Sequence, residues 1–133
     1  MVTPVLAALL ALQAAAPDVA PAPADPAAPA VSLDALPLEQ AATARCAIAF
    51  ATVSRWQKSG DTRGSAYPDM ETSGGREFFV QAMAKLMDDA GLTREDVMTL
   101  SFAEVERNET AEGTERVAAM MPACVLMKSA AGL

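Results

Sequence analysis

Apolar residues recur at spacings of three and four between residues 38 and 56, which is the period of an amphipathic helix. The residues on this shared face are Leu38, Ala42, Cys46, Ala49, Phe50, Val53 and Trp56. Pro37 suits the start of a helix, and Gly60 suits its end. The pattern predicts a helix from about Pro37 to Ser59, with Cys46 directed toward the core.

A second helix is predicted from about Gly75 to Ala90. Its apolar residues are Phe78, Phe79, Met83, Leu86 and Met87, and we expect all of them to be buried. Gly91 follows the last periodic residue and can adopt the left-handed conformation that ends many helices. The helix should therefore stop there.

The third helix has the strongest local start signal in the chain. Thr93 and Asp96 have the spacing of a capping box, so we expect a helix from Arg94 to about Arg107. Its apolar stripe consists of Val97, Met98, Leu100, Phe102 and Val105. Because this stripe is wide, it predicts packing against two neighbouring elements.

The last periodic segment predicts a helix from about Glu112 to Lys128. Its apolar residues are Val117, Met120, Met121, Cys124, Val125 and Leu126. Pro122 lies inside it and removes one backbone hydrogen bond, so a kink or a restart is expected there. No segment alternates with a period of two. Residues 37–133 are therefore predicted to form one all-α domain, a small bundle of about four helices.

The chain before this domain has a different composition. Val5–Leu12 is an unbroken apolar run followed by small residues, the order found in a cleavable secretory signal, so residues 1–16 are predicted to be a signal peptide. Residues 17–36 contain five prolines and no glycine and are predicted to be a disordered, Ala/Pro-rich linker. The predicted location is the periplasm or the extracellular space.

The two cysteines, Cys46 and Cys124, allow a single pairing in an exported chain. The alternative is a pair of buried free thiols. If the disulfide forms, the first and last helices must touch.

Charge and composition restrict the partners. Seventeen acidic residues outnumber ten basic ones, and the net charge is -7. The basic residues are dispersed, whereas phosphate recognition relies on clustered Lys and Arg, so no nucleic acid partner is expected. The apolar run is too short to cross a bilayer, so no membrane span is expected after processing.

Histidine is absent, which removes the Ser-His-Asp and Cys-His nucleophile systems and the commonest transition-metal ligand. The carboxylate pairs are better explained as solvated helix faces. The eight methionines could bind copper, but most fall on predicted apolar faces, where methionine is an ordinary core residue. No catalytic residue, metal or cofactor is therefore predicted, and the protein is not expected to be an enzyme.

Two local features could have a role in binding or modification. The non-periodic segment 60–75 is predicted to be a surface loop, and it brings Tyr67 near Trp56. These two aromatic residues are candidate interaction residues, or they pack on each other to hold the loop down. Asn108 begins an Asn-x-Thr glycosylation signal, although a role in ending the third helix is the simpler interpretation.

Three segments carry a resemblance: RCAIAFA at 45–51, GREFFVQAMAKLMDDAGLTREDV at 75–97 and MPACVLM at 121–127. Together they resemble a group of short exported proteins of Gram-negative bacteria that has no assigned function. The resemblance covers most of residues 38–133, includes both cysteines, and implies export and the pairing of Cys46 with Cys124. It implies no activity.

These observations favour a non-enzymatic binding or protein-interaction module. The alternative is a small carrier of a lipid or another hydrophobic ligand, held in a Met- and Phe-lined cavity between the last three helices. The partner is therefore either an unidentified protein or a hydrophobic ligand.

Overall fold

The computed structural model describes residues 31–133. Within this range the elements are a short 3-10 helix η1 (Leu33–Ala35), α1 (Leu38–Ser59), a second 3-10 helix η2 (Thr62–Ala66), α2 (Gly75–Ala90), α3 (Arg94–Glu109) and α4 (Ala111–Ala130). These residues contain four α-helices and no strand, which confirms the predicted all-α fold. The predicted signal peptide, residues 1–16, and the linker up to residue 30 lie outside the described residues.

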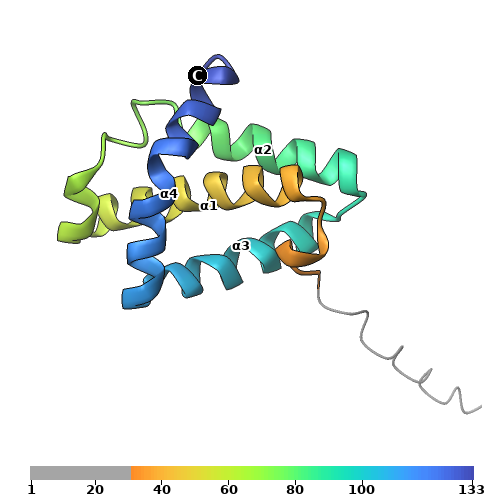
Figure 1. Ribbon diagram of the computed structural model, residues 1–133, viewed down its shortest axis with the longest axis horizontal. Helices are drawn as coiled ribbons and strands as arrows, with labels where there is room; N and C mark the ends of the chain where they lie inside the picture. Colours follow the sequence, from red (N-terminus) through yellow and green to blue (C-terminus); the bar gives the residue numbers. More distant parts are fainter. Residues whose placement is uncertain (1–30) are drawn as a thin grey trace, which may run out of the picture.

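Helix α1 is the centre of the molecule. It contacts every other helix of the described chain, with α2 and α3 along its two sides and α4 lying across it (Figure 1). The consecutive residues Ala47, Ile48 and Ala49 are all fully buried. Since successive helical residues point in different directions, the middle of α1 is enclosed on all sides and not on one face only. Leu38, at the start of the predicted buried face, is exposed instead.

The domain begins earlier than the change in composition predicts. Leu33 of η1 is buried in the core, and the residues on either side of η1, Val31 and Leu36, pack against it. Asp34 forms an ion pair with Arg45 of α1. The boundary predicted at Pro37 is therefore wrong, because residues 31–36 belong to the folded domain.

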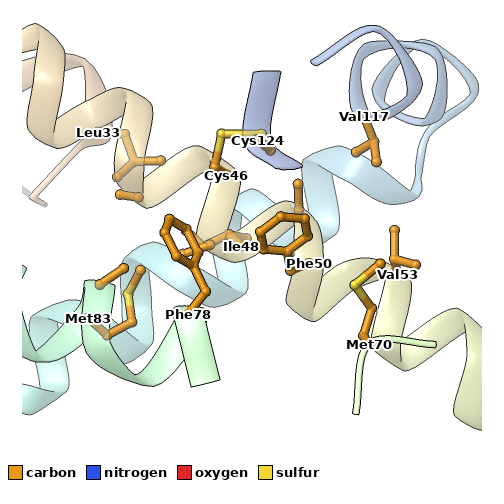
Figure 2. Close-up of a cluster of buried hydrophobic side chains, with 14 of the residues drawn as sticks. Leu33, Cys46, Ile48, Phe50, Val53, Met70, Phe78, Met83, Val117 and Cys124 are labelled. Atoms are coloured by element: carbon orange, nitrogen blue, oxygen red, sulfur yellow. A yellow bond between two sulfur atoms is a disulfide. The ribbon is translucent and has the colours of Figure 1, made fainter. Parts of the chain in front are cut away.

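The core is closed by aromatic packing and by the disulfide. Phe50 of α1 and Phe78 of α2 meet edge to face, with ring centres 5.5 Å apart. Cys46 of α1 and Cys124 of α4 form a disulfide with their Cα atoms 5.1 Å apart, which confirms the predicted pairing. Figure 2 shows this bond beside the Phe50 and Phe78 rings, so the covalent link lies within the core.

A buried polar contact joins three helices. The amide nitrogen of Asn108 on α3 donates to Thr52 Oγ1 of α1 at 3.2 Å, and its amide oxygen accepts from Arg116 of α4 at 3.3 Å. Asn108 does not end α3, which continues to Glu109. Its side chain is enclosed in the folded protein, so the Asn-x-Thr signal is not presented for glycosylation.

The other helix boundaries agree closely with the sequence pattern. Both hydrogen bonds of the predicted capping box are present, since Thr93 Oγ1 accepts from the Asp96 backbone and the Asp96 carboxylate accepts from the Thr93 backbone. Gly91 has a positive φ of 64° and ends α2. Of the kink or restart predicted at Pro122, the restart does not occur, because α4 is a single helix across that residue.

The turn between α3 and α4 requires a glycine at position 113. A Cβ atom on Gly113 would lie 2.0 Å from the carbonyl oxygen of Arg107. We expect Gly113→Ala to lower the free energy of unfolding by about 1 to 3 kcal/mol, because the overpacking outweighs the better helix propensity of alanine. Urea denaturation measures this. Ser129→Ala, at an exposed position of the same helix, is the control and should leave stability within about 0.5 kcal/mol of wild type. A Gly113→Ala variant as stable as the wild type would contradict the steric argument.

Candidate functional site

An open groove of about 510 Å³ runs between α2 and α3. Both helices pack against α1, and Ala51 of α1 contributes to the groove wall. The residues from α2 are Phe79, Val80, Met83, Ala84 and Met87, and those from α3 are Arg94, Val97, Met98, Ser101, Phe102 and Val105. The volume lies within the range of small-molecule sites in proteins.

The groove is lined by apolar side chains that remain open to solvent. Phe102 is 64% exposed, Val80 53% and Met98 49%. Among the described residues that line the groove, Arg94 and Ser101 are the only polar ones, and the Ser101 hydroxyl contacts the Met83 sulfur at 3.8 Å. A continuous exposed apolar surface of this kind is typical of an interaction or ligand site.

The groove lies on the opposite side of α1 from α4. Cys46 of α1 is bonded to α4, whereas Ala51 lines the groove. Five helical positions correspond to a rotation of about 140° around the helix axis. The predicted cavity between the last three helices is therefore corrected: α2 and α3 line it with a contribution from α1, and α4 takes no part.

The wide apolar stripe of α3 explains why the groove exists. Val97 and Leu100 are buried, as predicted, but the buried positions that continue this face are Glu104 and Asn108. Met98 and Phe102 point to a side where no second element of the described chain covers them. The expectation that the whole stripe is packed is wrong, and its unpacked part forms one wall of the groove.

In helix α2 the observed burial also differs from the prediction, though for fewer residues. Phe78 is buried, whereas Phe79 and Met87 are only partly buried and line the groove. The predicted buried set therefore divides between the core and the groove.

The candidate interaction residues lie elsewhere. Trp56 is 1% exposed, and its indole nitrogen donates to the carboxylate of Glu109 at 3.1 and 3.2 Å. Tyr67 is half-buried and packs against the core. In this conformation Trp56 is part of the folded interior and is not presented to a partner, and neither residue lines the groove.

A polar network holds Trp56 in place. The Arg63 guanidinium lies 4.5 Å from the centre of the Trp56 ring and pairs with both Asp61, at 2.6 Å, and Glu109, at 2.7 Å. Hydrogen bonds to Asp61, and secondarily to Glu109, raise the pKa of Arg63. Hydrogen bonds from Arg63 lower the pKa of Asp61. These charged groups are satisfied by each other, which indicates a structural role at the junction of α1, η2 and α3.

The segment 60–75 is tied to α1 by one side chain. Gln57 donates to the carbonyl oxygens of Gly64, Tyr67 and Pro68, and its amide oxygen accepts from the Met70 backbone at 3.0 Å. Met70 is buried. The segment is therefore an attached part of the domain, with less freedom than its glycine content suggests.

A smaller hollow of about 190 Å³ lies between α1 and α2. Its charged residues are Glu39, Lys85 and Asp89, and Lys85 pairs with Asp89 at 2.6 Å, which raises the pKa of Lys85. The amide oxygen of Gln40, also in the lining, is buried without a hydrogen-bond partner among residues 31–133. This hollow is smaller and more polar than the groove, which remains the stronger candidate site.

The described residues contain no group of three or more His, Cys, Asp or Glu side chains that could hold a metal ion. None of their helices has both the length and the apolar content needed to cross a membrane.

Arg94 is the residue of the groove that sequence reasoning missed. All ten basic residues fall within residues 31–133, and in this range Arg94 alone has a side chain with neither an ion pair nor a hydrogen bond. The sequence does contain a signal for this site. An apolar stripe that is too wide for contact with one helix begins one turn after Arg94.

No protein-family model, curated protein or solved structure matches this chain. The resemblance to short exported proteins therefore stays a prediction, and the function has to be argued from the groove.

Proposed function

We propose that this protein is a non-enzymatic binding protein of the periplasm or the extracellular space, and that it carries one hydrophobic ligand in the groove between α2 and α3. The observation that carries this proposal is the exposure of Val80, Met98 and Phe102 around an almost wholly apolar lining. Exposed side chains of this size have an unfavourable contact with water that a bound apolar ligand would remove.

The composition of the groove suits a ligand of variable shape. Met83, Met87 and Met98 contribute flexible, polarisable side chains that adapt to irregular apolar surfaces. Ala51 and Ala84 leave room between the larger residues. The groove is therefore well suited to an alkyl or acyl chain, which needs apolar contact along its length and few directed hydrogen bonds.

The burial of Trp56 favours a carrier over a protein-interaction module built on the aromatic pair. An interaction site centred on Trp56 and Tyr67 would need the indole at the surface, whereas its ring and its nitrogen are both engaged inside the domain. The groove requires no rearrangement before binding.

Export is supported by the disulfide. Cytosolic thiols are kept reduced, while disulfides persist in the periplasm and outside the cell. The bond between Cys46 and Cys124 joins the central helix to the last one, so the fold as described contains a covalent link that needs oxidising conditions to persist. Cell fractionation of the full-length protein with detection in the periplasmic extract tests this part.

Ligand binding is tested with the neutral apolar dye N-phenyl-1-naphthylamine, whose fluorescence rises in apolar sites. We expect Phe102→Lys to weaken dye binding by about tenfold, which corresponds to about 1.4 kcal/mol, because it removes ring contact and places an ammonium group in the groove. Phe102 is largely exposed, so the fold should tolerate the change. Fluorescence titration of the purified, oxidised protein measures the affinity.

The matched control is Leu126→Lys. Leu126 is 72% exposed on α4, on the other side of the molecule from the groove, so the substitution introduces the same charge without touching the site. Its dye affinity should equal that of the wild type. Equal dye affinities for the wild type, Phe102→Lys and Leu126→Lys would contradict the groove as the binding site. If the protein instead forms a concentration-dependent dimer that closes the groove, the proposed carrier function is contradicted.

A further inference from the structure

We infer that the ligand is a fatty acid, whose acyl chain lies in the groove and whose carboxylate is held by Arg94. This inference rests on the proposed function and specifies its ligand class. Within residues 31–133, the groove supplies a long apolar surface with a single cation in its lining. A single-chain carboxylate has the complementary distribution: one anionic group at the end of an apolar chain.

The fold does not account for Arg94. Seven of the other nine basic side chains form ion pairs within residues 31–133, and the remaining two, Arg116 and Lys128, donate hydrogen bonds to protein oxygens. Arg94 has no such partner in this part of the chain. Its guanidinium is therefore available to a ligand.

The position of Arg94 in its helix also costs stability. It is the first residue of α3, where the positive end of the helix dipole disfavours a cation. Of the two acidic neighbours, Asp96 is engaged in the capping box with Thr93, and Glu95 is adjacent in sequence and so points in a different direction. A basic residue at this position is unfavourable for the stability of α3, so a role in binding accounts for it better than a role in the helix.

Arg94 lies at one end of the groove. The turn at residues 91–93 reverses the chain, and α2 and α3 run in opposite directions (Figure 1). Arg94 is therefore near the Met87 end of α2, while Phe79 and Val105 are at the far end. From Arg94 to Val105 the rise along α3 is about 16 Å, so the lining offers an apolar path leading away from a terminal cation.

Arginine is well matched to a carboxylate. The planar guanidinium can donate two parallel hydrogen bonds to the two carboxylate oxygens. Each methylene of the acyl chain that leaves water for the groove adds a favourable contribution. Different parts of the site thus recognise the head group and the chain. A single substitution of Arg94 can therefore test the recognition of the head group separately from that of the chain.

The experiment compares dodecanoate with 1-dodecanol as competitors of the bound dye, at pH 7.5 and below the critical micelle concentration, on the full-length oxidised protein. We expect Arg94→Gln to weaken dodecanoate binding by about three- to tenfold while leaving dodecanol binding unchanged. The control is Arg76→Gln, at an exposed position on α2 that is not part of the groove lining. Its affinities for both competitors should match those of the wild type.

Three outcomes would overturn the inference alone. If Arg94→Gln loses affinity equally for dodecanoate and dodecanol, Arg94 does not recognise the head group. If its affinity for dodecanoate is unchanged, Arg94 makes no contact with the carboxylate. Dye binding without displacement by either competitor would exclude a single acyl chain while leaving the proposed carrier function standing. Absence of dye binding to the wild type would instead reject the proposed function and the inference with it.

Discussion

Loss of the disulfide is expected to lower the free energy of unfolding by about 3 to 4 kcal/mol in a Cys46→Ser/Cys124→Ser double variant. The two cysteines are 78 positions apart in sequence, so the bond closes most of the folded domain into one loop. Cross-linking a loop of this length removes conformational freedom from the unfolded chain, and the chain-entropy relation gives about 4 to 5 kcal/mol as an upper figure. Small domains have a total free energy of unfolding of about 5 to 15 kcal/mol, so this one bond contributes a large share of the stability.

Thermal unfolding followed by circular dichroism measures the effect. For a domain of this size, a loss of 3 to 4 kcal/mol should lower the melting temperature by roughly 15 to 25 °C. Wild-type protein treated with a reductant is the control and should melt close to the double variant. Equal melting temperatures for oxidised wild type and the double variant would contradict a stabilising role.

Truncation of Phe50 should have a comparable effect. The ring is 1% exposed in α1 and meets Phe78 of α2 edge to face. Phe50→Ala removes a large side chain from an interior whose neighbours can relax only in part, so we expect a loss of about 3 to 5 kcal/mol of unfolding free energy. The lost aromatic pair contributes to that figure. Urea denaturation of oxidised protein measures it.

Leu38→Ala is the matched control for this variant. Leu38 lies on the same helix and was predicted on the same apolar face, but its side chain is 84% exposed. The substitution should change the unfolding free energy by no more than about 0.5 kcal/mol. A loss from Leu38→Ala as large as that from Phe50→Ala would mean that the start of α1 is also buried.

The disulfide and Phe50 belong to the closed core around α1, whereas the proposed function concerns the open groove between α2 and α3. Cys46, with its bond to α4, fixes one face of the central helix, while Ala51 borders the groove on the other. Substitutions of the exposed groove residues Val80, Met98 and Phe102 should therefore alter ligand affinity with little effect on stability. Substitutions in the closed core should lower the free energy of unfolding with little direct effect on ligand affinity.

The helices themselves could be predicted from the sequence. Apolar spacing, the capping box at Thr93 and Asp96, and the glycines at 60 and 91 are local signals, and they place the boundaries within about two residues of the observed ones. The disulfide followed from a count of two cysteines. Local signals suffice here because helix start and stop depend on neighbours a few residues away.

The environment of each helix could not be predicted in the same way. The pattern of α1 indicates one apolar face, yet residues such as Ala47 are buried on the other faces, because alanine is apolar enough for a core and small enough for close packing. Conversely, Phe102 and Met98 have the pattern of core residues and lie in an open groove. Periodicity shows which residues are apolar and not how many neighbours will cover them.

By itself the sequence determined four helices, their boundaries and their covalent link, because these depend on local chemistry and on a pair of cysteines. The tertiary structure alone decided that α1 is enclosed, that Trp56 is buried against Arg63 and Glu109, and that the apolar stripe of α3 is only half covered. These features depend on which elements far apart in the chain come together. The groove lies between α2 and α3 on the side of the molecule opposite α4, where no further element of residues 31–133 covers the exposed side chains of these two helices.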